Sequence, residues 1–86
     1  MIDEQSSEQR LRRLSWRCRR GMKELDVLLQ PFFEHRYISL SAEQQACFEA
    51  MMAEEDVDLL DWLVNAVPAP DNYAPLIGLI LELPLA

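Results

Sequence analysis

The chain has 86 residues, half of them hydrophobic, and a formal net charge of −7. A chain of this length buries only about 60–65% of its unfolded surface, which leaves too little protein to enclose an active-site cleft. The acidic total also argues against general nucleic-acid binding, because phosphates repel most of the chain. We therefore predict one domain over residues 1–86 that binds another protein and is not an enzyme.

Charge is distributed unevenly along the chain. Residues 1–36 contain all eight Lys and Arg residues and six acids, a formal charge of +2, whereas residues 37–86 contain nine acids and no Lys or Arg, a charge of −9. The molecule is expected to have a basic end and an acidic end. Nucleic-acid binding through the basic segment from Arg10 to Lys23 is an alternative, but we expect no retention on DNA or RNA at physiological salt.

The sequence also limits location and metal chemistry. No apolar run approaches the ~20 residues of a membrane span, and the first residues are acidic and polar, unlike a signal or transit peptide. We expect a cytoplasmic monomer that does not insert into a membrane. Cys18, Cys47 and His35 are too few ligands for a zinc site, and His35 has no catalytic signature around it. We expect reduced thiols, although the sequence leaves a Cys18–Cys47 disulfide open.

Apolar residues recur at helical spacing and predict an all-α fold, a compact bundle of about five short helices. Residues 1–6 are expected to be flexible, and Ser7 is a candidate N-cap of the first helix. This helix has one narrow apolar stripe, formed by Leu11, Leu14 and Cys18. Trp16 lies outside the stripe among arginines, so it either packs on another helix or serves as a contact anchor.

The second helix is expected to start at Met22, and Pro31 within it predicts a kink or an end between residues 27 and 31. Its expected buried face consists of Met22, Leu25, Leu28, Leu29 and Phe32. Ser41 and Gln44 form a capping-box pattern before a third helix at about 42–54. That helix is expected to bury Cys47, Phe48, Met51 and Met52.

Two more helices are expected in the acidic half. Asp56 is the candidate N-cap of a helix at about 57–66, and two prolines shortly afterwards end it. Its expected inward residues are Leu59, Leu60, Leu63 and Val67. Asp71 or Asn72 can cap a fifth helix at about 73–82 that is apolar on nearly every side. Such a helix is either central to the core or covered by something else, such as a second copy.

The most informative stretch runs from Trp16 to Glu24, where the basic helical pattern meets the first glycine and a second helix begins. Gly21 is expected to end the first helix in left-handed geometry, which costs glycine almost nothing. Arg20 and Glu24 then flank an exposed corner. The candidate partner-binding residues are Trp16, Arg19, Arg20, Gly21, Met22 and Glu24. We assign no catalytic, cofactor-binding or metal-binding residue.

Residues Arg20-Gly21-Met22-Lys23-Glu24 have the Arg-Gly-x-x-Glu form of the SdhE family, the small flavinylation factors of succinate dehydrogenase. Two further stretches resemble that family in the same order and at similar spacing: Pro31-Phe32-Phe33-Glu34-His35 and Asp58-Leu59-Leu60-Asp61-Trp62-Leu63. The resemblance covers roughly residues 8–82, nearly the whole chain. The ordered set is much more specific than the five-residue motif alone.

The resemblance implies an assembly factor that binds the flavoprotein subunit of succinate dehydrogenase or fumarate reductase and promotes covalent attachment of FAD to that subunit. FAD would then belong to the partner, and this chain would bind no cofactor itself, which agrees with the absence of a glycine-rich phosphate loop. Relatives described as antitoxins imply an alternative, a toxin–antitoxin component.

Roles at the corner follow as hypotheses. Arg20 would pair with a carboxylate or carbonyl of the partner, and Glu24 would orient Arg20 or meet a partner cation. Gly21 would let the partner's backbone come close. The plainer alternative is an exposed Arg20–Glu24 pair worth under ~1 kcal/mol, with Gly21 as a simple helix cap.

Overall fold

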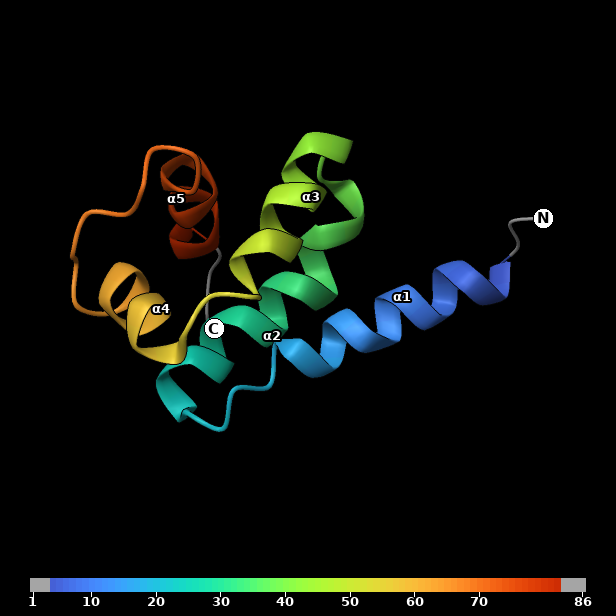
Figure 1. Cartoon of the computed structure of the whole chain (residues 1–86), viewed down its shortest axis with the longest axis horizontal. Helices are drawn as coiled ribbons and strands as arrows, with labels where there is room; N and C mark the ends of the chain where they lie inside the picture. Colours follow the sequence, from blue (N-terminus) through green and yellow to red (C-terminus); the bar gives the residue numbers. More distant parts are fainter. Residues whose placement is uncertain (1–3, 83–86) are drawn as a thin grey trace.

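The computed structural model describes residues 4–82, and side chains from residue 8 onward. The regular secondary structure in this part of the chain consists of helices joined by loops, with no strand, as the all-α prediction requires (Figure 1). Its elements are α1 (Glu4–Arg17), α2 (Lys23–Arg36), the short 3₁₀ helix η1 (Tyr37–Ser39), α3 (Ala42–Met51), α4 (Asp56–Leu63) and α5 (Ala74–Glu82). No helix within residues 4–82 has the length and apolar character needed to cross a bilayer.

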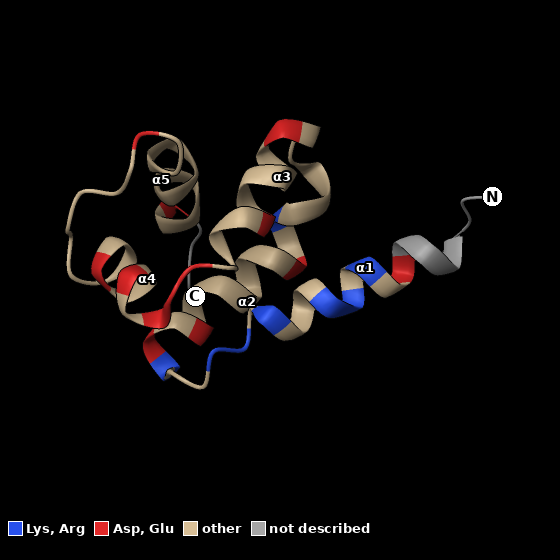
Figure 2. Cartoon of the chain, viewed as in Figure 1, with Lys and Arg blue, Asp and Glu red and all other residues tan. Residues whose placement is uncertain are grey.

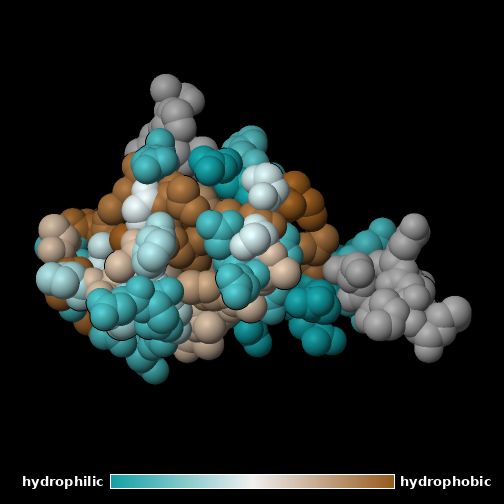
Figure 3. Space-filling view, turned by 90° about the horizontal axis from the view of Figure 1, so that it is seen from above, coloured by the Kyte–Doolittle hydropathy of each residue, from teal (hydrophilic) through white to brown (hydrophobic). Residues whose placement is uncertain are grey.

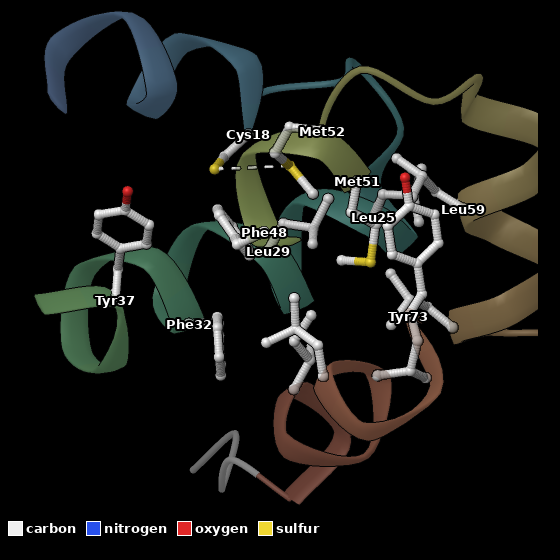
Figure 4. Close-up of a cluster of buried hydrophobic side chains, with 14 of the residues drawn as sticks. Cys18, Leu25, Leu29, Phe32, Tyr37, Phe48, Met51, Met52, Leu59 and Tyr73 are labelled. Atoms are coloured by element: carbon white, nitrogen blue, oxygen red, sulfur yellow. Dashed lines mark hydrogen bonds between the residues drawn. The ribbon is translucent and has the colours of Figure 1, made fainter. Parts of the chain in front are cut away.

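Helix α2 is the centre of the bundle, and η1, α4 and α5 all pack against it. Its residues Leu25, Leu29 and Phe32 are completely buried, and Phe32 packs on Phe48 of α3 with ring centroids 5.7 Å apart (Figure 4). Phe33 turns toward Tyr37 of η1, with centroids 5.1 Å apart. Phe33 also stacks on Phe48, with ring centroids 6.3 Å apart, so the two adjacent phenylalanines share Phe48 as a neighbour.

Helix α1 differs from the others because it extends away from the body (Figure 1). Leu14 and Cys18 are buried and Leu11 is partly buried, as the apolar stripe predicted. Helix α1 begins at Glu4, so Ser7 lies inside it and is not its N-cap. The expected flexible segment falls partly on residues 1–3, outside the described part of the chain, whereas residues 4–6 belong to α1.

Pro31 does not end α2, which continues to Arg36. A proline removes one helical hydrogen bond, but buried neighbours on either side of it, Leu29 and Phe32, anchor both halves of α2 in the core. Of the two outcomes predicted for Pro31, an end of the helix between residues 27 and 31 is therefore wrong, and a kink there stays a prediction. The capping box at α3 is confirmed: Gln44 N–H donates to Ser41 Oγ at 3.1 Å, and Ser41 N–H donates to Gln44 Oε1 at 2.9 Å.

The acidic half departs from prediction in detail. Helix α3 ends at Met51, three residues early, and Glu55 takes the N-cap position of α4 that was predicted for Asp56. Val67 is 43% exposed, since α4 stops at Leu63 and the chain leaves the core. Tyr73 precedes α5 and is buried, so neither Asp71 nor Asn72 is next to the helix start.

Helix α5 is central to the core on one side only. Leu76, Ile77 and Ile80 are buried, whereas Leu81 is 50% exposed. Seen from above, the surface around α3 and α5 mixes apolar and hydrophilic side chains (Figure 3). The predicted position of α5 in the core thus accounts for its buried face. Coverage of its exposed face by a second copy of the chain stays a prediction.

Candidate partner-binding corner

The corner, residues 16–24, connects α1 to α2. The backbone N–H of Cys18 still donates to Leu14 O at 3.1 Å, but the regular helix ends at Arg17, before Gly21. Gly21 has φ +81°, so its left-handed conformation is confirmed. It nevertheless does not cap α1, because three residues intervene, and instead it turns the chain into α2. A Cβ at Gly21 would meet no atom within 4 Å, so this backbone is open to the outside.

Arg20 points into the molecule, with its side chain only 13% exposed. Its Nε donates to Asp56 Oδ1 at 2.6 Å. Its two terminal nitrogens donate to three backbone carbonyls at 2.7–2.9 Å, those of Met52, Glu54 and Arg17. Its own N–H donates to Asp26 Oδ1 at 2.8 Å. One residue thus ties together the ends of α1 and α3 and the beginnings of α2 and α4.

This network explains two departures from the sequence prediction. Carbonyls at a helix C-terminus lack intrahelical partners, and Arg20 satisfies two of them in the turn after α3. The carboxylate of Asp56 is used by Arg20, so it does not cap α4. The expectation of an exposed Arg20 paired with Glu24 is wrong, because the guanidinium points inward and pairs with Asp56. A contact between Arg20 and a partner stays a prediction.

The network partners Asp26 and Asp56 were absent from the predicted site. Asp56 is 36 positions from Arg20 in sequence, and nothing local to either residue marks the pairing. Asp26 offered a weak signal, since a carboxylate in the first turn of a helix commonly accepts a backbone N–H.

The outer side of the corner comprises the exposed residues Trp16, Arg17, Arg19, Gly21, Lys23 and Glu24. Trp16 is 66% exposed, with the guanidinium carbon of Arg19 5.4 Å from its ring centroid. Of the two alternatives for Trp16, packing on another helix is excluded. Met22 is half-buried. Basic residues follow α1 into the corner and acidic residues begin in the first turn of α2 (Figure 2).

Cys18 lies beneath the corner, with its Sγ 4.0 Å from Met52 Sδ (Figure 4). Burial raises the pKa of the Cys18 thiol to about 12, so it is a packing residue and not a nucleophile. Cys47 is half-buried and donates to Asn72 O at 3.2 Å, and burial raises its pKa too. Both cysteines are free, so the disulfide alternative does not hold in this structure. Within residues 4–82, no three His, Cys, Asp or Glu side chains are grouped for a metal ion.

Comparison with known proteins agrees with the motif at the corner. The family model described as "Flavinator of succinate dehydrogenase" matches residues 12–84. A protein of Serratia sp. (strain ATCC 39006) named FAD assembly factor SdhE is 41% identical over 69 residues, covering 79% of this chain and 78% of that protein.

Two other proteins of the same name, from Pectobacterium atrosepticum and Yersinia pseudotuberculosis, are 45% and 47% identical over 53 residues. Those matches cover 62% of this chain and 60% of each relative, so the chain spans only part of the length of these two relatives. The match to the family model, by contrast, includes the whole corner and all of α2 to α5. The chain belongs to the family of succinate dehydrogenase flavinators.

Proposed function

We propose that the chain is an assembly factor that binds the flavoprotein subunit of succinate dehydrogenase or fumarate reductase and promotes covalent attachment of FAD to it. Family membership and the names of the relatives support this function. The observation that carries it is the corner, where the family motif forms an open turn with a fixed inner side and an exposed outer side.

The outer side of the corner is the proposed docking surface. Gly21 lets the partner's backbone approach where a side chain would collide, and Trp16 is an exposed aromatic anchor of the kind that dominates protein interfaces. Glu24 presents a carboxylate from the first turn of α2. Arg20 acts as a positioning residue, because its bonds hold α1 and α2 in the arrangement that exposes the other three.

On this proposal the chain supplies binding energy and no reacting group. The flavin and the partner's own residues carry out the attachment, and the assembly factor favours the arrangement of the partner in which it occurs. The chain itself is not an enzyme and binds no FAD. The expectations of a cytoplasmic monomer without affinity for nucleic acid stay predictions, as does the antitoxin alternative.

Co-expression with a flavoprotein subunit tests the proposal. Glu24→Ala is compared with Glu43→Ala, because both glutamates are exposed and lie in the first turn of a helix. We expect Glu24→Ala to lower covalent flavin on the subunit at least ~10-fold, the loss of one well-placed contact worth about 1.4 kcal/mol. Glu43→Ala should leave it unchanged. Flavin fluorescence of the denatured subunit measures the product.

Thermal unfolding of both variants provides the control for folding. If both have the melting temperature of the unmodified chain and both support full flavinylation, the docking role of the corner is wrong. If the unmodified chain gives no more covalent flavin than its absence, the proposed function itself fails.

A further inference from the structure

A hollow of about 140 Å³ lies between α1 and α3 and adjoins the corner at Arg17. It is lined by Arg10, Arg13, Leu14, Arg17 and Glu49. The three arginines are spaced i, i+3 and i+7, so they share one face of α1. The hollow is open to solvent, and three of its five lining residues are arginines.

The one acid in this hollow is already occupied. Glu49 Oε2 accepts hydrogen bonds from Arg10 Nη2 at 3.0 Å and from the Tyr37 hydroxyl at 2.8 Å. Burial, together with the bond to Glu49, raises the pKa of Tyr37 to about 12, so its phenol stays a donor at neutral pH. The carboxylate of Glu49 is therefore balanced by Arg10 and has little capacity left for other cations.

Arg13 and Arg17 are exposed, and neither has an acidic side chain within 4.0 Å among the residues that the structure describes. Three arginines and one glutamate give the hollow a formal charge of +2. Two unpaired guanidinium groups one helical turn apart can hold a carboxylate in the bidentate geometry that arginine favours. The Arg10–Glu49 bond shows an arginine of this same face binding a carboxylate from another element.

We propose that Arg13 and Arg17 bind an Asp or Glu side chain of the protein partner. The hollow is open to solvent, which suits a group projecting from an acidic protein surface better than a free small molecule. Arg17 lines the hollow and is also part of the corner, so one partner surface can contact both. That the partner is the flavoprotein rests on the proposed function.

Binding of the purified flavoprotein subunit tests the hollow. Arg13→Gln/Arg17→Gln should raise Kd about 10- to 100-fold and flatten its dependence on salt, because two charge-assisted contacts are lost. Arg12→Gln/Arg36→Gln is the matched control, since it removes the same charge from residues that do not line the hollow. The control should change Kd less than about threefold.

The outcomes separate the two proposals. If Glu24→Ala weakens binding while Arg13→Gln/Arg17→Gln does not, the proposed role of the hollow is wrong and the proposed function stands. If the unmodified chain does not bind the flavoprotein, the proposed function fails, and NMR titration decides on the hollow. Saturable shifts of the Arg13 and Arg17 side-chain N–H signals with hexaglutamate then support it. No shift, or tighter binding of inorganic phosphate than of hexaglutamate, overturns it.

Discussion

The inner and outer sides of the corner are built from the same five-residue motif but have opposite character. On the inner side, Arg20 is nearly buried and satisfied by Asp56 and three carbonyls. On the outer side, Gly21 and Glu24 are exposed, with open space beside the glycine. The sequence predicted that the whole motif forms one contact surface. In the structure, Arg20 instead fixes the shape of the corner, and Gly21 and Glu24 are exposed on it.

The largest expected effect is on the inner side. Arg20→Ala should lower the free energy of unfolding by about 3 kcal/mol, because it leaves several polar groups without a partner at once. Arg20→Lys keeps the charge near Asp56 but loses the planar fork, so we expect about half that loss. Urea unfolding measures both. Arg19→Ala on the outer side is the control, and a loss for Arg20→Ala no larger than for Arg19→Ala would show that the network contributes little.

Cys18 provides a second measure of how closed the inner side is. At pH 8 we expect Cys47 to react with iodoacetamide at least ~100-fold faster than Cys18, which is buried with a pKa raised to about 12. The same shift makes stability depend on pH. The folded pKa lies above 9.0, so the contribution of the neutral thiol is complete below pH 9 and is lost as pH rises toward 12.

Mass spectrometry of partially alkylated protein measures the two rates. Equal labelling of both cysteines in the native state would mean that the corner opens frequently and that the inner side is not a fixed support. In Arg20→Ala, we expect labelling of Cys18 to accelerate, since the corner above it is then less stable.

Replacing each of the two exposed glycines by alanine is expected to change the stability of the chain in opposite directions. Gly21→Ala should destabilise the chain by about 1 kcal/mol, because φ +81° strains any residue with a Cβ although no atom obstructs it. Gly78 lies in α5 with the same open surroundings, so Gly78→Ala should stabilise by roughly 0.5–1 kcal/mol. Thermal unfolding compares them. A neutral Gly21→Ala would show that the turn relaxes to another conformation.

The sequence predicted the fold well because helix formation is mainly local. Apolar periodicity correctly identified Leu14, Leu25, Phe32 and Phe48 as core residues, and the Ser41–Gln44 capping box needs only residues three positions apart. Errors occurred where tertiary contacts override local preference. Pro31 sits within a continuous α2 because the core holds the helix on both sides of it.

At the candidate site, the sequence located the corner but not the orientation of its side chains. The family resemblance pointed to Arg20, Gly21 and Glu24, and the left-handed turn at Gly21 followed from residue type. The direction of Arg20 depends on where the end of α3 and Asp56 come to lie, 32 to 36 positions later. Sequence near Arg20 does not show that these distant residues contact it in the fold, so an exposed arginine was expected from the sequence.

The smallest expected effect on stability belongs to Trp16. Its ring is 66% exposed and contacts the Arg19 guanidinium, a surface cation–π interaction of about 0.5 kcal/mol. Trp16→Ala should therefore leave the free energy of unfolding within about 0.5 kcal/mol of the unmodified chain, while binding of the flavoprotein weakens at least ~10-fold. Ile38→Ala is the control, because Ile38 is an apolar residue that is even more exposed, at 75%, and is distant in sequence from the corner. If both substitutions weaken binding of the flavoprotein to the same extent, Trp16 has no specific role in docking. If only Trp16→Ala weakens binding, then Trp16 contacts the partner, which explains why a large apolar side chain is kept at the surface although it does not stabilise the fold.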